Sequence, residues 1–432
     1  MNLSENLLEK SRADRQENTE KVRLRRDWRW SVSAWVMSVL CAVMGLSAHG
    51  VSVVSFQNAT TWFPTGNVDL PAQPTILILT VACVAGSVAA TWLTLRHGKA
   101  PGWIAGLSGM FFLMALLLFV VAGREGSVMP LVSLLQSTLA LAIPLVFGSL
   151  SGLVCEHTGV INIAIEGQLL LGAFLAAVVA SATSSPYLGL VGASIAGALV
   201  AVLLALFTVK YRVDHIIVGV VLNMLVVGLT SFLYSTWLKF NENTLNRPMS
   251  LKSLAIPVLS DIPIIGPVLF KQSLLVYLMY LAVIVLNFAL FRSRWGLRSR
   301  ACGEHPKAAD TVGINVNLYR WRNVLLGGAL AGLGGAYFTV GAGLAFSKDM
   351  AAGNGFIALA AMILGKWNPK GAVAASLLFG FATALGYVMQ SVNSPIPTDF
   401  LLMIPYIVTI LAVAGFVGRV RPPAMEGKPY PL

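Results

Sequence analysis

The polar side chains with the most informative spacing lie in residues 159–168, inside a long apolar stretch. Asn162 and Glu166 are four residues apart, so a helix would place them on one face, and Gln168 follows closely. An ionisable side chain in hydrocarbon usually faces the interior of a bundle or a watery cavity, so the pattern favours the wall or gate of a solute pathway. A glycine near each end of the segment would allow a broken helix. The alternative is that Glu166 lies near a membrane surface or is packed in its neutral form.

A second segment, residues 353–371, has glycines at both ends and an apolar centre several residues short of a full membrane crossing. It predicts a discontinuous helix of the kind that borders binding sites in transporters, so Asn354 and Phe356 are further pathway candidates. Asn223, a polar residue in another apolar segment, joins them. Trp367 lies close to two lysines and is interpreted as an anchor at the membrane interface.

Residues 292–323 carry the densest internal cluster of basic side chains. Gly303 can end one short stretch and Pro306 can begin another, since proline is accepted in the first turn of a helix. Residues 307–311 are therefore predicted to form a short helix with a small-residue face, Ala308 and Ala309. Such a face suits the docking of a protein partner, whereas an anchor on lipid would need only the basic residues.

The sequence offers no chemistry of its own for catalysis. No segment matches G-x-x-x-x-G-K-[ST], so the chain is not expected to hydrolyse ATP unaided. The five histidines and four cysteines are scattered, without the spacing of metal ligands. We therefore predict no catalytic residue, no metal site and no cofactor bound by this chain.

The elements that must position these residues are membrane helices. Of the 432 residues, 56% are apolar and 11% are charged, which excludes an ordinary water-soluble protein. The net charge of +12 is attributed to basic cytoplasmic loops and not to nucleic-acid binding. The predicted fold is all-α: a polytopic integral membrane bundle of about 10–12 hydrophobic segments with broken helices and both termini in the cytosol. The segments are expected at about 31–54, 74–95, 103–122, 132–154, 160–181, 188–209, 215–237, 273–291, 322–344, 355–366, 371–390 and 399–418.

The same pattern divides the chain into parts. They are a charged cytosolic leader (1–30), an N-terminal extension with about three transmembrane helices (31–125), a core (126–420) that contains the basic loop (292–320), and a cytosolic tail (421–432). In the core, Gly328 and Gly332 form a G-x-x-x-G pattern, which is typical of closely packed helices.

Three segments carry a family resemblance. Residues 143–172, centred on TGVINIAIEG, resemble permease subunits of bacterial ABC importers in the branched-chain amino acid and ribose class, closest to its nucleoside or simple-sugar branch. Residues 296–309, GLRSRACGEHPKAA, are similar to the coupling loop of that family. Residues 353–371 are similar to its G-x-G-F…G-x-W-x-P-x-G segment, and the resemblance extends over about residues 130–420.

The resemblance implies a multi-pass permease of a bacterial cell membrane that forms the pathway of an ATP-driven importer for a small polar solute, a nucleoside or a simple sugar. It implies two separate cytosolic subunits that bind ATP and magnesium, a second and different permease subunit, and an extracytoplasmic substrate-binding lipoprotein. The residues that it assigns to docking on the ATPase are Arg300, Gly303, Glu304, Pro306, Ala308 and Ala309. The alternative is a secondary transporter driven by an ion gradient, which would favour several buried acidic or histidine residues, and this chain offers few.

Overall fold

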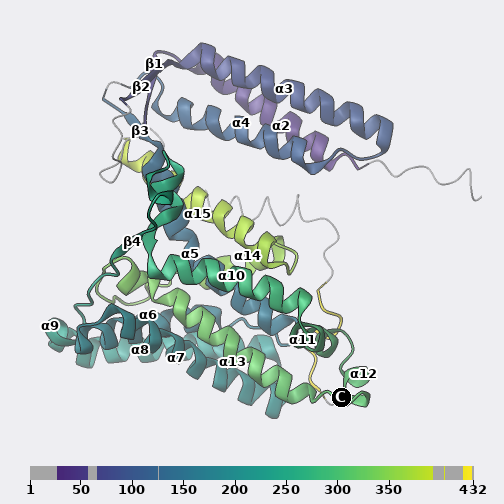
Figure 1. The fold of residues 1–432 in the computed structure, drawn as a ribbon, viewed down its shortest axis with the longest axis vertical. Helices are drawn as coiled ribbons and strands as arrows, with labels where there is room; N and C mark the ends of the chain where they lie inside the picture. The colour runs from purple at the N-terminus through teal and green to yellow at the C-terminus, as the bar shows by residue number, and fades with distance from the viewer. Residues whose placement is uncertain (1–26, 57–65, 125, 393–402, 404–421, 431–432) are drawn as a thin grey trace, which may run out of the picture. The chain divides into compact units, whose positions relative to one another are not determined.

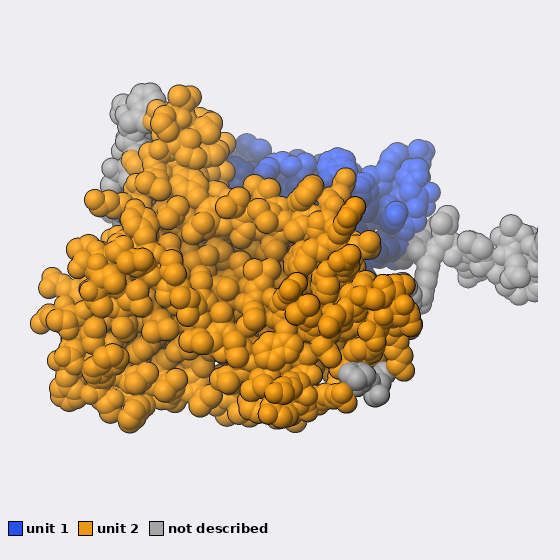
Figure 2. Space-filling view, turned by 60° about the horizontal axis from the view of Figure 1, so that its bottom comes forward, with its two compact units in different colours: residues 1–55, 66–129 blue, residues 56–65, 130–432 orange. Residues whose placement is uncertain are grey.

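The chain forms two compact units. The computed structural model describes residues 27–56, 66–124, 126–392, 403 and 422–430 (Figure 1). Unit 1 comprises residues 1–55 and 66–129, and unit 2 comprises residues 56–65 and 130–432 (Figure 2). The residues expected to line a pathway and to dock a partner all lie in unit 2.

Unit 1 contains three long apolar helices, each packed against the other two. They are α2 (Arg29–Ser47), α3 (Ala72–His97) and α4 (Gly102–Val121). Buried hydroxyl pairs join α2 to α3, with Ser31 Oγ 2.9 Å from Thr94 Oγ1 and Ser38 Oγ 2.8 Å from Ser87 Oγ. Hydrogen bonds of this kind hold helices together in lipid, where apolar surface gives little preference for another helix over a lipid tail.

A small sheet of strand order β2-β1-β3 follows α2. Its strands are β1 (Val51–Ser55), β2 (Val68–Pro71) and β3 (Val128–Pro130). The predicted span at 31–54 is therefore wrong at its end: α2 stops at Ser47, and Gly50, with φ of 76°, leads into β1. The β-branched residues of β1 suit a strand as well as a buried helix, so hydropathy could not place this boundary.

Unit 2 is a helix bundle. Ten described helices are long and apolar enough to cross a membrane, and those outside unit 1 form this bundle. They are α5 (Leu131–Glu156), α6 (Ile165–Thr183), α7 (Pro186–Ala205), α8 (His215–Leu233), α10 (Leu274–Arg292), α13 (Val316–Gly335) and α15 (Pro369–Ser391). Its shorter helices are α9 (Glu242–Leu245), α11 (Arg294–Glu304), α12 (Pro306–Thr311) and α14 (Asn354–Leu364), and its two paired strands are β4 (Ser253–Ala255) and β5 (Lys271–Ser273).

The polytopic helical membrane fold is thus confirmed. The short segment expected at 355–366 is α14, and the segment expected at 399–418 lies outside the described residues. The side of the membrane on which each terminus lies stays a prediction.

One end of unit 2 gathers the basic loop and three other segments. The turn 157–164, the turn 365–368 and the last described residues, 422–430, contact α11 or one another there (Figure 1). We call this the basic end: α11, α12, these two turns and residues 422–430. The positive-inside rule predicts that it faces the cytosol.

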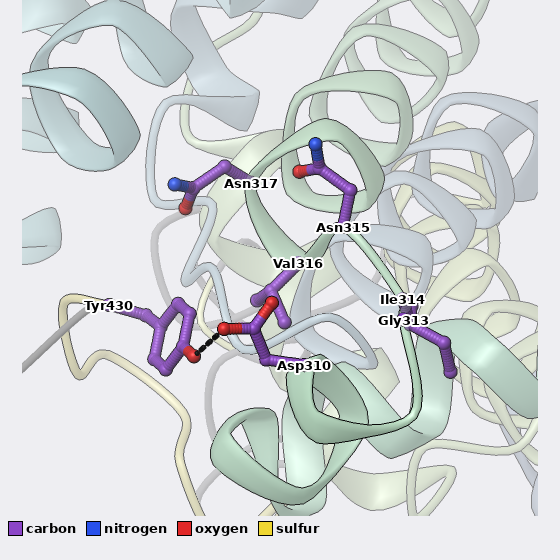
Figure 3. A pocket seen from close by; sticks show the side chains of 7 residues that line it. All are labelled: Asp310, Gly313, Ile314, Asn315, Val316, Asn317 and Tyr430. Atoms are coloured by element: carbon purple, nitrogen blue, oxygen red, sulfur yellow. Dashed lines mark hydrogen bonds between the residues drawn. The ribbon is translucent and has the colours of Figure 1, made fainter.

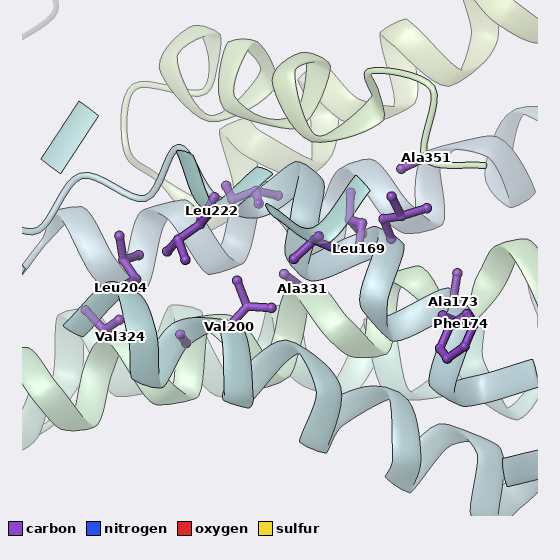
Figure 4. Close-up of a cluster of buried hydrophobic side chains, with 14 of the residues drawn as sticks. Leu169, Ala173, Phe174, Val200, Leu204, Leu222, Val324, Ala331 and Ala351 are labelled. Carbon is purple, nitrogen blue, oxygen red and sulfur yellow. The ribbon is translucent and has the colours of Figure 1, made fainter. Parts of the chain in front are cut away.

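The core of unit 2 has α5 at its centre, with every residue from 142 to 156 buried. A second cluster fills the space between α6, α7, α8 and α13 (Figure 4). It includes Leu169, Phe174, Val200, Leu204, Leu222 and Val324. Where α13 approaches α7, a Cβ on Gly332 would lie 2.8 Å from the nitrogen of Gly197, and one on Gly328 would lie 2.6 Å from its oxygen. Gly328 and Gly332 therefore lie where the two backbones meet.

Candidate functional site

The path from α5 to α6 is a break in the bundle formed by residues 157–164. Gly159 has φ of 87°, a left-handed conformation that ends α5 and that glycine adopts at little cost. The helical part of the predicted span 160–181 accordingly begins only at Ile165. A break inside an apolar bundle leaves backbone groups that need new partners.

Asn162 and Gln168 supply part of the new bonding. The Asn162 amide donates to Gln168 Oε1 at 3.0 Å, and the Gln168 amide donates back to Asn162 Oδ1 at 3.3 Å. Asn162 Nδ2 also donates to Ser151 Oγ on α5 at 3.0 Å. Both amides are fully buried, so this pair ties the break to α5 and α6 from within.

Asn223 reaches the break from α8. Its Oδ1 accepts the N–H of Gly167 at 2.8 Å, and its Nδ2 donates to the carbonyl of Ile163 at 2.9 Å. A Cβ on Gly167 would lie 3.1 Å from Asn223 Oδ1, so the absence of a side chain there admits the asparagine. Asn223 replaces the backbone partners that a continuous helix would have provided.

Glu166 joins the break to α14. Its Oε1 accepts the N–H of Gly353 at 2.7 Å, and its Oε2 accepts the N–H of Gly355 at 2.6 Å. A carboxylate at this position satisfies the free N–H groups of a helix start and opposes the positive end of the helix dipole. A Cβ on Gly355 would lie 2.5 Å from the nitrogen of Glu166, so α14 approaches α6 backbone against backbone.

The six pathway candidates therefore fall into two groups. Asn162, Glu166, Gln168 and Asn223 are buried, and each is hydrogen-bonded to another segment of the junction. Asn354 donates to the carbonyl of Ala351 at 2.7 Å, while Phe356 is 50% exposed on this chain. The structure brings all six to the α5–α6–α14 junction, and their contact with a solute stays a prediction.

The interpretation of Trp367 as an anchor at the membrane interface is wrong. Its side chain is only 9% exposed, and its indole N–H donates to Glu156 Oε2 at 2.5 Å. His157 Nε2 lies 3.1 Å from the carbonyl oxygen of Trp367. Burial lowers the pKa of His157 to about 4; the hydrogen bond to Trp367 acts to raise this pKa, and the charge of Arg300 acts to lower it. The ring is therefore neutral and donates from Nε2.

The tight conformation of the turn 365–368 accounts for the presence of glycine on either side of Trp367 in the sequence. Gly365 and Gly371 touch backbone against backbone, and Lys366 and Trp367 have φ of 56° and 53°. Asn368 then caps α15, with its Oδ1 accepting the N–H of Lys370 at 3.0 Å. The tight turn carries Trp367 back under α5, and no local pattern in the sequence could reveal a partner 211 residues away.

The basic loop contains the predicted short helix as α12, which begins at Pro306. Its two alanines differ: Ala308 is exposed, whereas Ala309 is 3% exposed and packs in a cluster with Cys302 and Val316. Val312, which follows α12, is 74% exposed. The outward surface of α12 is thus formed around Ala308, and Ala309 fixes the helix to the protein.

The other residues expected in docking hold α11 in place. Gly303 lies on the break, since a Cβ there would be 2.5 Å from the carbonyl oxygen of His157. The Arg300 guanidinium lies over the ring of Phe291, 5.4 Å from its centre. Glu304 Oε2 accepts the N–H of Ala424 at 3.4 Å.

Sequence reasoning missed Arg320 and residues 422–430. Arg320 is 1% exposed, donates from Nε to the carbonyl of Thr158 at 3.1 Å, and donates from Nη1 to the carbonyl of Lys428 at 3.0 Å. In the sequence it is one arginine of a basic cluster, and nothing local distinguishes a buried one. A cleft of about 330 Å³ at the basic end is lined by Asp310, residues 313–317 and Tyr430 (Figure 3).

Residues 134–413 match the family model described as "Branched-chain amino acid transport system / permease component". The chain belongs to this family. It is 40% identical over 296 residues to the nucleoside ABC transporter permease protein NupC of Lactococcus lactis, covering 66% of this chain and 93% of that protein. It is 38% identical over 306 residues to the guanosine ABC transporter permease protein NupQ of Bacillus subtilis, covering 69% of this chain and 96% of that protein. No solved structure matches the chain.

The predicted family and its class of function are therefore confirmed: the chain is a permease of an ABC transporter and a multi-pass membrane protein. Permeases of this family are transport subunits that work with separate ATP-binding subunits and a substrate-binding protein. The match begins at residue 134, so the helices of unit 1 lie before it.

Proposed function

We propose that this permease carries nucleosides through a bacterial cell membrane as part of an ATP-driven importer. The observation that supports the cargo is the 40% identity to a nucleoside permease across 93% of that protein's length. The assembly that we propose includes two cytosolic ATPase subunits, a second and different permease subunit and an extracytoplasmic binding lipoprotein. ATP and magnesium belong to the ATPase subunits, and this chain binds no cofactor.

In the proposed cycle the ATPase pushes on α12 through the exposed surface around Ala308. The motion reaches the α5–α6 break because Gly303 lies directly on the carbonyl of His157. From the break it reaches α14 through the two N–H groups that bind Glu166. Alternating access then requires two packings of these helices, each favoured at a different stage of the ATPase cycle.

The half-exposed Phe356, at the start of α14, is the candidate for contact with a nucleobase, since its ring offers a stacking surface. Asn354 beside it offers polar groups for the sugar or base. The four buried candidates, in contrast, are proposed to hold the pathway open or closed through the junction that they brace.

The test is uptake by the whole transporter reconstituted in liposomes with its ATPase subunits, second permease and binding lipoprotein. We expect ATP-dependent accumulation of labelled guanosine or adenosine and none of glucose. Uptake of glucose alone would support a sugar permease instead, a second candidate because the chain is 34% identical over 261 residues to a putative glucose ABC transporter permease of Haloferax volcanii. Uptake by the chain alone under an ion gradient would support a secondary transporter.

A second test examines docking. Ala308→Glu places a charge on the exposed surface of α12 without touching the core, and we expect uptake to be lost while the permease still inserts. Asn243→Glu, at an exposed position of α9 at the other end of unit 2, is the control and should transport normally (Figure 1). Normal uptake by Ala308→Glu would refute the docking role of α12.

A further inference from the structure

Residues 422–430 lie across the basic end and bind three other segments of it (Figure 1). The N–H of Met425 donates to the carbonyl of Gly303 at 2.9 Å, and the N–H of Gly427 donates to the carbonyl of Gly159 at 3.0 Å. The hydroxyl of Tyr430 donates to Asp310 Oδ2 on α12 at 2.8 Å (Figure 3). This segment therefore contacts the break, the end of α11 and α12 within nine residues.

The buried side chain of Arg320 connects residues 422–430 to the break. Its Nε and Nη1 bind the carbonyls of Thr158 and Lys428, and its Nη2 is buried without a hydrogen-bond partner among the described residues. Burying a guanidinium is costly unless its surroundings compensate, and here the compensating bonds go to carbonyls of the two segments that Arg320 joins. Gly427 fits the join closely: its φ is 72°, and a Cβ there would lie 2.8 Å from Ile161 Cδ1.

We propose that residues 422–430 form a strap that fixes α11 and α12 to the α5–α6 break, so that movement of α12 reaches the helices of the pathway. This inference rests on the proposed function, because it concerns how the stroke of the ATPase subunits is transmitted. Arg320 and Gly427 are the positioning residues of the strap.

The lengths of the elements support this role. α12 has six residues, too few to be stable as an isolated helix, and it buries only the two small side chains of Pro306 and Ala309. The strap binds α11 at Gly303 and α12 at Asp310. It also binds the break, directly at Gly159 and, through Arg320, at Thr158. Gly303 already touches the break, and the strap adds the bonds that make α12 follow it, so loosening the strap weakens the transmission of α12 movement to the break.

The test uses the complete transporter with its ATPase subunits and measures guanosine uptake and ATP hydrolysis together. Gly427→Val forces a side chain against Ile161 and disfavours the left-handed backbone, so the bond to Gly159 is lost. We expect the complex to assemble and to hydrolyse ATP, with uptake per ATP reduced about tenfold, as expected for the loss of one or two hydrogen bonds. Lys428→Ala is the matched control, since it removes an exposed side chain and keeps the carbonyl that Arg320 binds.

Two outcomes overturn the strap. One is unchanged uptake per ATP in Gly427→Val. The other is joint loss of ATPase co-purification, ATP hydrolysis and uptake, which would make the segment a part of the docking surface and not a transmitter.

A readout independent of the cargo keeps the strap testable if the transporter carries no nucleoside. Hydrogen exchange of the amides of residues 301–311 should accelerate in Gly427→Val and in Tyr430→Phe, and not in Lys428→Ala. Tyr430→Phe removes a single hydroxyl and leaves folding intact. Unchanged exchange in both variants contradicts the strap, whereas absence of nucleoside uptake by the unmodified complex contradicts only the proposed function.

Discussion

The carboxylate of Glu166 stabilises a helix start that lipid cannot solvate. It accepts two N–H groups of α14, and Glu166→Gln keeps its size but leaves one oxygen for two donors. We expect a loss of about 1–3 kcal/mol in the free energy of unfolding, as for a buried group left without its partner. Thermal or denaturant unfolding of the purified protein in detergent measures it. Glu242→Gln on exposed α9 should change stability by less than about 0.5 kcal/mol, and equal losses in both variants would exclude a specific cap.

His157 makes the basic end sensitive to acid. Burial lowers its pKa to about 4 from an ordinary 6.5, so the folded protein holds a neutral ring where the unfolded chain would take up a proton. Its contribution to stability is therefore present above about pH 6.5 and is lost progressively as pH falls towards 4. His157→Gln can still donate to the Trp367 carbonyl but does not titrate. We expect its melting temperature to fall less than that of the unmodified protein between pH 7.5 and 4.5, and parallel curves would contradict the prediction.

The polar residues of the break could be found from the sequence because they interrupt apolar segments. Asn162, Glu166 and Gln168 stand out in this way, and the structure places them together with Asn223. The bonding of Trp367 and Arg320 could not be predicted, since their partners Glu156 and Thr158 are 211 and 162 residues distant. Hydropathy identifies a residue that needs a partner, and only the fold supplies the partner.

Among the elements, α14 depends on a backbone approach that admits no side chain. A Cβ at Gly355 would lie 2.5 and 2.6 Å from backbone atoms of Glu166, which cannot move aside as a side chain could. We expect Gly355→Ala to reduce the free energy of unfolding by about 1–3 kcal/mol, the range for overpacking, and to weaken transport. Gly228→Ala on α8 is the control, because a Cβ there meets nothing within 4 Å. It should be neutral or slightly stabilising, since alanine favours a helix over glycine.

Hydropathy predicted the spans of the core because a helix that crosses a membrane needs about 20 mostly apolar residues, whether they face other helices or lipid. It could not predict where α2 gives way to β1, since strands and helices use the same apolar residues there. It also could not separate Ala308 from Ala309 on α12, because burial of Ala309 depends on how α12 packs against Cys302 of α11 and Val316 of α13. Local sequence thus predicts the long apolar helices, while the end of α2 and the face that a helix buries depend on packing.

At the scale of the whole molecule, the spans of unit 1 affect how the core enters the membrane. Unit 1 contributes α2, α3 and α4, three helices long and apolar enough to cross a membrane, so we expect an odd number of crossings before α5. The basic end is predicted to face the cytosol, and α5 ends at the break that Gly303 contacts, so we expect α5 to begin outside the cell. The leader, residues 1–30, has eight Lys or Arg and is expected to remain inside. Three crossings would therefore reconcile the predicted cytosolic leader with a core predicted to start on the other side of the membrane.

Deleting residues 31–125 should expose this conflict, because the basic leader would then precede a span that must start outside. We expect a fraction of the molecules to insert inverted, whereas deletion of residues 1–125 removes leader and extension together and should preserve orientation. Lys307→Cys, at an exposed position of α12, reports orientation through a membrane-impermeant maleimide applied to intact cells, and the four native cysteines are buried. Protection in the full-length protein and in the longer deletion, with labelling in the shorter one, is the expected result. Equal protection in all three proteins would show that the leader does not set orientation. Labelling of the full-length protein would place α12 outside the cell, beyond the reach of a cytosolic ATPase.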